Sequence, residues 1–99
     1  MIRLMVLYPR GEGTHFNSEY WLSKHIPMVS TNWPKMKKWE ADIAAPDSPY
    51  YAVGHMYFDS IEDVQATMSS AETVTLMGDI PNYTNTSPII STNTVSATS

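Results

Sequence analysis

His25 is the residue in this 99-residue chain whose type and position best suit chemistry. At about 100° per residue, a helix from Glu19 to Val29 places His25 on one arc with its apolar side chains. These neighbours are Trp21, Leu22, Ile26, Met28 and Val29. An imidazole with an ordinary pKa near 6.5 suits general acid–base catalysis at neutral pH. The alternative is a core histidine that donates a hydrogen bond to a backbone carbonyl and takes part in no reaction.

Two other ring types offer further candidate positions. Tyr8 ends the first predicted strand, where its phenol can donate to a ligand oxygen or a developing oxyanion, or simply pack at the strand end. His55 shares a strand face with Tyr57, and for His55 we favour an interface role over a catalytic one. Tyr20 falls roughly opposite the apolar arc, so we expect it to anchor the helix against another segment, such as residues 79–83.

Aromatic side chains either fill the core or line a pocket. If a pocket exists, they favour a flat aromatic or polyketide-like substrate. We therefore take His25 and Tyr8 as candidate catalytic residues. The candidate substrate-binding residues are Trp21, Phe16, His55, Tyr57, Val29 and Trp33.

The sequence predicts no metal, phosphate or nucleic-acid site. Its three histidines fall on a loop, a helix and a strand without ligand spacing, and cysteine is absent. The loop Gly11–Gly13 lacks the further glycine and the Lys-Ser/Thr pair of phosphate loops. The net charge is −4, and the basic residues cluster only around Lys35, Lys37 and Lys38, which argues against a nucleic-acid partner.

Nothing in the sequence predicts a membrane segment or a leader. No run approaches the roughly 18 apolar residues that a membrane helix needs. The first residues carry neither a long apolar run nor a small-residue cleavage site. We therefore expect a cytoplasmic protein.

The elements that must hold these residues follow the order strand, helix, strand, strand, helix, strand. Strands are expected over residues 2–8, 35–43, 50–58 and 87–95. The first helix is expected from Asn17 or Ser18 to about residue 33, kinked or broken at Pro27, and the second over residues 60–68. A short helical piece over residues 71–77 would end at Gly78.

This order is typical of the ferredoxin-like βαββαβ fold, an α+β architecture with helices on one face of an antiparallel sheet. We expect one domain over residues 1–99, with the tail after about residue 91 frayed or paired with a partner chain. Since two helices cannot cover both faces of the sheet, the second face must pack on something, most simply a second copy.

Several segments resemble the EthD family of the dimeric α/β-barrel superfamily. The most specific is Tyr-x4-His-x-Pro, formed here by Tyr20, His25 and Pro27. The resemblance extends over residues 6–9, Phe16, 20–28, 54–58, 60–62 and 79–84. It implies a homodimer whose two sheets face each other, with a cavity between sheet and helices in each subunit.

The resemblance constrains the activity less than the fold. EthD-like proteins include accessories of degradation pathways such as ether degradation, and some fungal relatives look like dehydratases or decarboxylases of aromatic polyketides. We therefore expect a cofactor-independent enzyme that acts through His25 by dehydration, isomerisation or decarboxylation of an aromatic or ketone-bearing metabolite. The alternatives are a non-catalytic accessory or hydrophobic-metabolite-binding protein and a cofactor-free monooxygenase. Superfamily analogy also leaves haem ligation by His25 open.

Overall fold

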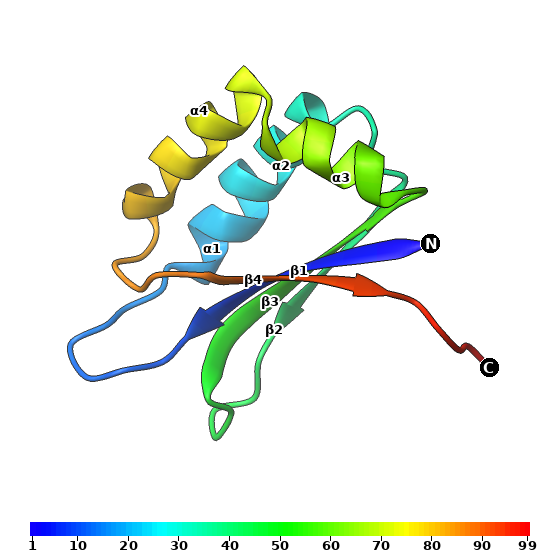
Figure 1. Ribbon diagram of the computed structural model, residues 1–99. Coiled ribbons are helices and arrows are strands. Elements are labelled where there is room, and N and C mark those ends of the chain that lie inside the picture. The colour runs from blue at the N-terminus through cyan, green and yellow to red at the C-terminus, as the bar shows by residue number, and fades with distance from the viewer.

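Four antiparallel strands form one sheet in the order β2-β3-β1-β4 (Figure 1). The computed structural model describes all residues from Met1 to Ser99. The strands are β1 (Ile2–Pro9), β2 (Lys38–Ile43), β3 (Tyr50–Phe58) and β4 (Ile89–Thr94). All helices lie on one face of the sheet, and the other face is open (Figure 1). The predicted α+β ferredoxin-like fold is confirmed.

Six helical segments cover the sheet. They are α1 (Ser18–Tyr20), the π-helix η1 (Trp21–His25), α2 (Ile26–Asn32), α3 (Ile61–Met68), α4 (Ala71–Asp79) and the 3₁₀-helix η2 (Ile80–Asn82). Asn17 caps the first of them, since its side-chain oxygen accepts from the Tyr20 amide at 3.1 Å. Ser60 caps α3 in the same way, accepting from the Asp63 amide at 3.1 Å.

A change of hydrogen-bonding pattern accommodates Pro27. Proline has no amide hydrogen and so cannot donate to the carbonyl of Ser23. The chain forms a π-helix just before it, in which the Ile26 amide donates to the carbonyl of Trp21, five residues back. Regular α-helix then resumes with Pro27 in its first turn. The extra residue of the π-turn rotates the side chains about the helix axis, and Leu22, expected on the buried arc, is exposed.

The core lies between the helices and the inner face of the sheet. Alternation places Ile2, Leu4, Val6 and Tyr8 of β1 on this face, in register with Phe58, Met56, Gly54 and Ala52 of β3. Gly54 and Ala52 of β3, which lie beside the end of β1, leave room for an aromatic cluster. Its buried aromatic members are Tyr8, Trp21 and Tyr83, which pack with Ile26 and Ala52.

The boundaries of β2 and α4 differ from the prediction. β2 begins at Lys38 rather than residue 35. Gly78 does not end α4, because Gly13 is the only glycine with a positive φ and Gly78 keeps a helical backbone. The helix instead runs to Asp79 and tightens into η2. At the other end of the chain, β4 pairs with β1 through Thr94.

None of the helices has the combination of length and apolar character needed to cross a bilayer.

Candidate active site

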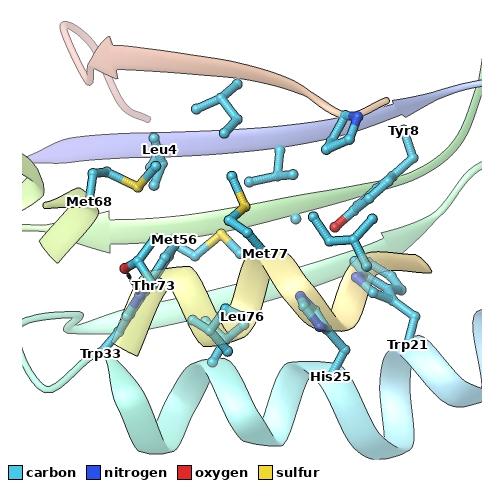
Figure 2. A pocket seen from close by; sticks show the side chains of 16 residues that line it. Leu4, Tyr8, Trp21, His25, Trp33, Met56, Met68, Thr73, Leu76 and Met77 are labelled. Atoms are coloured by element: carbon cyan, nitrogen blue, oxygen red, sulfur yellow. Dashed lines mark hydrogen bonds between the residues drawn. The ribbon is translucent and has the colours of Figure 1, made fainter. Parts of the chain in front are cut away.

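An apolar cavity lies between the inner face of the sheet and the helical layer (Figure 2). Its volume is about 40 Å³, which is room for no more than a few water molecules. A ligand therefore requires side chains at its edge to move. The lining residues are Leu4, Val6, Tyr8, Trp21, His25, Val29, Trp33, Gly54, Met56, Met68, Thr73, Leu76, Met77, Ile80, Pro88 and Ile90.

The mouth of this cavity lies between α4 and β4. Met77 of α4 and Ile90 of β4 are 43% and 39% exposed, whereas the lining residues Leu4 and Trp21 are almost fully buried. Three of the lining side chains are methionines, including Met77 at the mouth. Since methionine is unbranched and adapts to irregular space, this lining can rearrange around a ligand.

His25 lies on η1 and directs its ring into the cavity (Figure 2). Its Nδ1 atom is 2.9 Å from Oδ2 of Asp79, the last residue of α4. Its Nε2 atom has no hydrogen-bond partner in the protein. Since no fully buried side-chain nitrogen or oxygen lacks a partner, Nε2 must be open to accessible space. One nitrogen of the imidazole is thus held by a carboxylate while the other is free.

Asp79 is the partner that sequence reasoning did not identify. Its Oδ1 atom accepts from the Tyr20 hydroxyl at 2.8 Å and from Nδ2 of Asn82 at 2.9 Å. The expectation that Tyr20 anchors its helix against residues 79–83 is confirmed by this contact. No lysine or arginine pairs with Asp79. Its buried carboxylate is surrounded instead by three hydrogen-bond donors, from Tyr20, Asn82 and His25.

The charges of this pair follow from its surroundings. Burial alone would raise the pKa of Asp79, but the hydrogen bonds from Asn82, His25 and Tyr20 outweigh it and hold that pKa below its usual range. Burial lowers the pKa of His25 below 6.5, although Asp79 opposes the shift. At neutral pH Asp79 is therefore ionised and His25 is neutral.

This charge state determines the tautomer of His25. An ionised carboxylate can only accept, so Nδ1 of His25 carries the proton and donates it to Asp79. The basic lone pair of the imidazole then lies on Nε2, the nitrogen that has no hydrogen-bond partner in the protein. A neutral imidazole oriented by a carboxylate in this way is a general base, as in the histidine–aspartate part of hydrolase triads.

Tyr8 places a second functional group on the cavity wall. Its hydroxyl lies 2.7 Å from the hydroxyl of Tyr83, whose ring centroid is 4.7 Å from that of His25. Burial raises the pKa of both phenols, so both stay protonated at neutral pH. When Tyr83 donates to Tyr8, the Tyr8 proton is free to donate to an oxygen in the cavity (Figure 2).

The other predicted binding residues separate into two groups. Trp21, Val29 and Trp33 line the cavity, and the Trp33 indole donates to Oγ1 of Thr73 at 2.9 Å. Phe16 does not line it but packs behind Tyr8, with ring centroids 5.1 Å apart. Its role in the structure is to support the aromatic cluster.

His55 and Tyr57 lie on the opposite, open face of the sheet, away from the cavity. Successive residues of β3 point to opposite faces, and the neighbours Gly54 and Met56 occupy the cavity side. His55 Nε2 is instead 2.7 Å from Oδ2 of Asp42, and the Tyr57 hydroxyl donates to Glu40 at 2.7 Å. The structure therefore does not bring His55 or Tyr57 together with His25.

The histidines and carboxylates form pairs rather than metal-binding groups. No set of three or more histidine, aspartate or glutamate side chains lies close enough to hold a metal ion. His25 and Tyr8 line the mostly apolar cavity, and their hydrogen-bond partners Asp79 and Tyr83 do not line it.

Comparisons with known proteins agree with this fold. The chain is similar to the crystal structure of an EthD-like protein from Ralstonia eutropha JMP134, with 27% identity, 97% and 92% of the two chains covered and a TM-score of 0.85. It is also similar to SnoaB, a cofactor-independent oxygenase from Streptomyces nogalater, with 7% identity, 98% and 94% covered and a TM-score of 0.74. A dimeric ferredoxin-like protein of unknown function from Bacteroides fragilis NCTC 9343 has 14% identity, 93% of each chain covered and a TM-score of 0.64.

No curated protein matches the chain. The family model of the EthD domain matches residues 14–87, a stretch that contains Tyr20, His25, Asp79 and Tyr83. Because this match spans most of the chain, the protein belongs to the EthD domain family.

Proposed function

We propose that this protein is a cofactor-independent enzyme that moves a proton within a neutral, apolar substrate carrying a carbonyl or phenol oxygen. The observation that supports this most directly is the free Nε2 of a neutral His25, oriented by Asp79 at an apolar cavity. A base in such a place meets little competition from water. The tyrosine hydroxyl on the same wall supplies the complementary donor.

In this proposal His25 removes a proton from the carbon next to a carbonyl. Tyr8 donates to the carbonyl oxygen as negative charge develops there. Asp79 stabilises the imidazolium that forms, and His25 then returns the proton. Return to a different carbon gives isomerisation, and transfer to a departing hydroxyl gives dehydration. Decarboxylation fits less well, since no lysine or arginine lines the cavity to hold a substrate carboxylate.

The lining also favours a substrate class. Trp21 and Trp33 present flat aromatic surfaces, and the methionines adapt to the ligand's outline. Aromatic ketones and polyketide-like phenols have a flat shape and a carbonyl or phenol oxygen, which this arrangement suits. An accessory protein that only binds such a metabolite would need the same apolar lining but no oriented base.

Hydrogen–deuterium exchange tests the proton-transfer step even when the product of the reaction is unidentified. The protein is incubated in D2O with a panel of neutral aromatic ketones, and loss of the α-proton signal is followed by NMR. We expect exchange catalysed by the wild type and lost in His25→Gln, with His55→Gln as a matched control that retains it. If ketones of the panel bind but none of them exchanges its α-proton, the accessory role would be favoured.

A cofactor-free monooxygenase is the second candidate. Removal of a proton by His25 would convert a phenol to an electron-rich phenolate, or an anthrone to a carbanion, and such an anion can transfer an electron to O2, the oxidant of this reaction. The shared fold with SnoaB keeps this candidate open, although a likeness at 7% identity supports the fold alone. If the wild type consumes oxygen with phenols or anthrones and His25→Gln does not, the protein would be a monooxygenase rather than an enzyme of redox-neutral proton transfer.

We also propose a homodimer formed through the open face of the sheet. This face carries apolar side chains at its centre, among them Met5, Leu7, Val53 and Ile89, with the His55–Asp42 pair beside them. Ile89 is 51% exposed in the single chain. Covering such a face removes apolar surface from water, and a dimer of the same fold is known from Bacteroides fragilis.

A further inference from the structure

Asp79 is a buried carboxylate with no permanent cation. It is 7% exposed, and its only ion-pair partner is His25, which is neutral at neutral pH. It is also the last residue of α4, where the helix dipole disfavours negative charge. A lone buried carboxylate is costly unless hydrogen bonds satisfy it. The neutral donors around Asp79 must therefore carry most of its stabilisation.

Tyr20 is the donor best placed to control this carboxylate. Its hydroxyl donates to Oδ1 of Asp79 at 2.8 Å, although the two residues are 59 positions apart in the chain. Its ring stacks on Tyr83, with centroids 6.0 Å apart and planes 22° apart. Tyr20 does not line the cavity, so it has no contact with a ligand there.

We propose that Tyr20 is a positioning residue, whose hydroxyl holds Asp79 in the place and charge state from which Asp79 orients His25. This inference rests on the proposed function for its catalytic meaning, but not for its test. Asn82 donates to the same oxygen at 2.9 Å and shares the task. Two donors on Oδ1 leave Oδ2 directed at His25.

The polar groups that face the His25–Asp79 pair come from four segments. Tyr20 is on α1, Asn82 on η2, Tyr83 follows η2, and Tyr8 of β1 reaches the pair through Tyr83. No lysine or arginine contributes a competing charge. Removing the Tyr20 hydroxyl leaves Asp79 less stabilised and more basic. The imidazolium form of His25 is then favoured, and His25 titrates at a higher pH.

The test is an NMR titration of His25 in Tyr20→Phe, which keeps the ring and removes only the hydroxyl. We expect the His25 midpoint to rise by about 0.5 to 1 pH unit relative to wild type. If exchange by His25 is established, the acid limb of its kcat/KM profile should move by the same amount, as a readout additional to the titration. Tyr57→Phe, which removes the tyrosine–Glu40 bond on the open face, is the matched control and should leave His25 unchanged.

A second variant and a double variant make the result decisive. Asn82→Ala removes the other donor to Oδ1 of Asp79, and because Asn82 is exposed to solvent the substitution leaves no buried space. The His25 midpoint should shift in the same direction as in Tyr20→Phe. Adding Tyr20→Phe to Asp79→Asn should produce no further shift, because the hydroxyl acts through the carboxylate. An unchanged His25 midpoint in a folded Tyr20→Phe or Asn82→Ala protein would overturn the inference. These titrations use the protein without substrate. The role of Tyr20 can therefore be refuted even if His25 is shown to catalyse exchange, and it can be confirmed even if no exchange is found.

Discussion

Replacing Asp79 by asparagine tests how the carboxylate controls His25. In the wild type Oδ1 accepts from two donors, Tyr20 and Asn82, while Oδ2 accepts from His25 alone. The new amide has one oxygen and one NH2 group, and its oxygen best serves the position with two donors. Its NH2 group then faces Nδ1 of His25, which must accept. The proton of the neutral imidazole consequently moves to Nε2, and the cavity loses its base.

The size of this effect can be estimated from the lost interaction. A hydrogen bond to a charged group contributes about 1.5–3 kcal/mol, and about 1.36 kcal/mol corresponds to one pH unit. Since Asp79 and His25 are 2.9 Å apart, the pKa of His25 should fall by about 1 to 2 units below its wild-type value. Loss of the base tautomer should reduce kcat by about 10²- to 10⁴-fold.

Two measurements check this prediction. NMR of 15N-labelled histidine reports both the tautomer and the pH midpoint of His25, and the exchange assay reports kcat. Asp42→Asn is the matched control, because Asp42 makes the equivalent 2.7 Å contact with His55 on the open face. It should leave His25 and the exchange rate unchanged. If Asp79→Asn retained the wild-type tautomer and rate, Asp79 would not control the tautomer of His25.

Three further predictions concern stability, the oxyanion donor and assembly. Burial holds the pKa of His25 below its ordinary value of 6.5, so the unfolded chain takes up a proton first as the pH falls, and stability decreases below about pH 6.5. Urea unfolding should show a weaker pH dependence below about pH 6.5 in His25→Gln than in the wild type. Tyr8→Phe should lower kcat by about 10²- to 10³-fold in the exchange assay with little change in KM. The same variant should lower the unfolding free energy by about 1–3 kcal/mol, measured in urea, because the Tyr83 hydroxyl loses its partner. Leu7→Glu places a charge on the open face and should give a folded monomer in analytical ultracentrifugation, whereas a stable dimer would place the interface elsewhere.

The sheet could be predicted from the sequence because its strands carry their own signals. β1 ends at Pro9 and β3 ends at Phe58, and side chains alternate between the two faces along both strands, so the residues that share a face follow from the pattern. That alternation places Tyr8 on one face of β1 and groups His55 with Tyr57 on one face of β3. Which face holds the cavity depends on the packing of the helices. For this reason the sequence groups His55 and Tyr57 with a site that they do not join.

The His25–Asp79 pair could not be predicted, for two physical reasons. Its members lie 54 residues apart, and local pattern carries no signal for such a contact. Gly78 also suggests a helix end before Asp79, whereas the helix continues through it.

The π-turn explains how Tyr20 and His25 come to share one carboxylate. At about 100° per residue, the two side chains are far apart around a regular helix. Hydrogen bonding between residues five apart brings such positions toward one side, and both side chains reach Asp79. Pro27 is the visible signal of an irregular helix, but its consequence for these two side chains depends on the kind of irregularity.

The proposed chemistry requires His25 to present a free lone pair on Nε2 to the cavity at neutral pH. A long-range 1H–15N correlation spectrum of the wild-type protein at pH 7 measures this directly. We expect a neutral ring with its proton on Nδ1 and an Nε2 shift characteristic of an unprotonated nitrogen. A ring protonated on Nε2, or an imidazolium at pH 7, would contradict it.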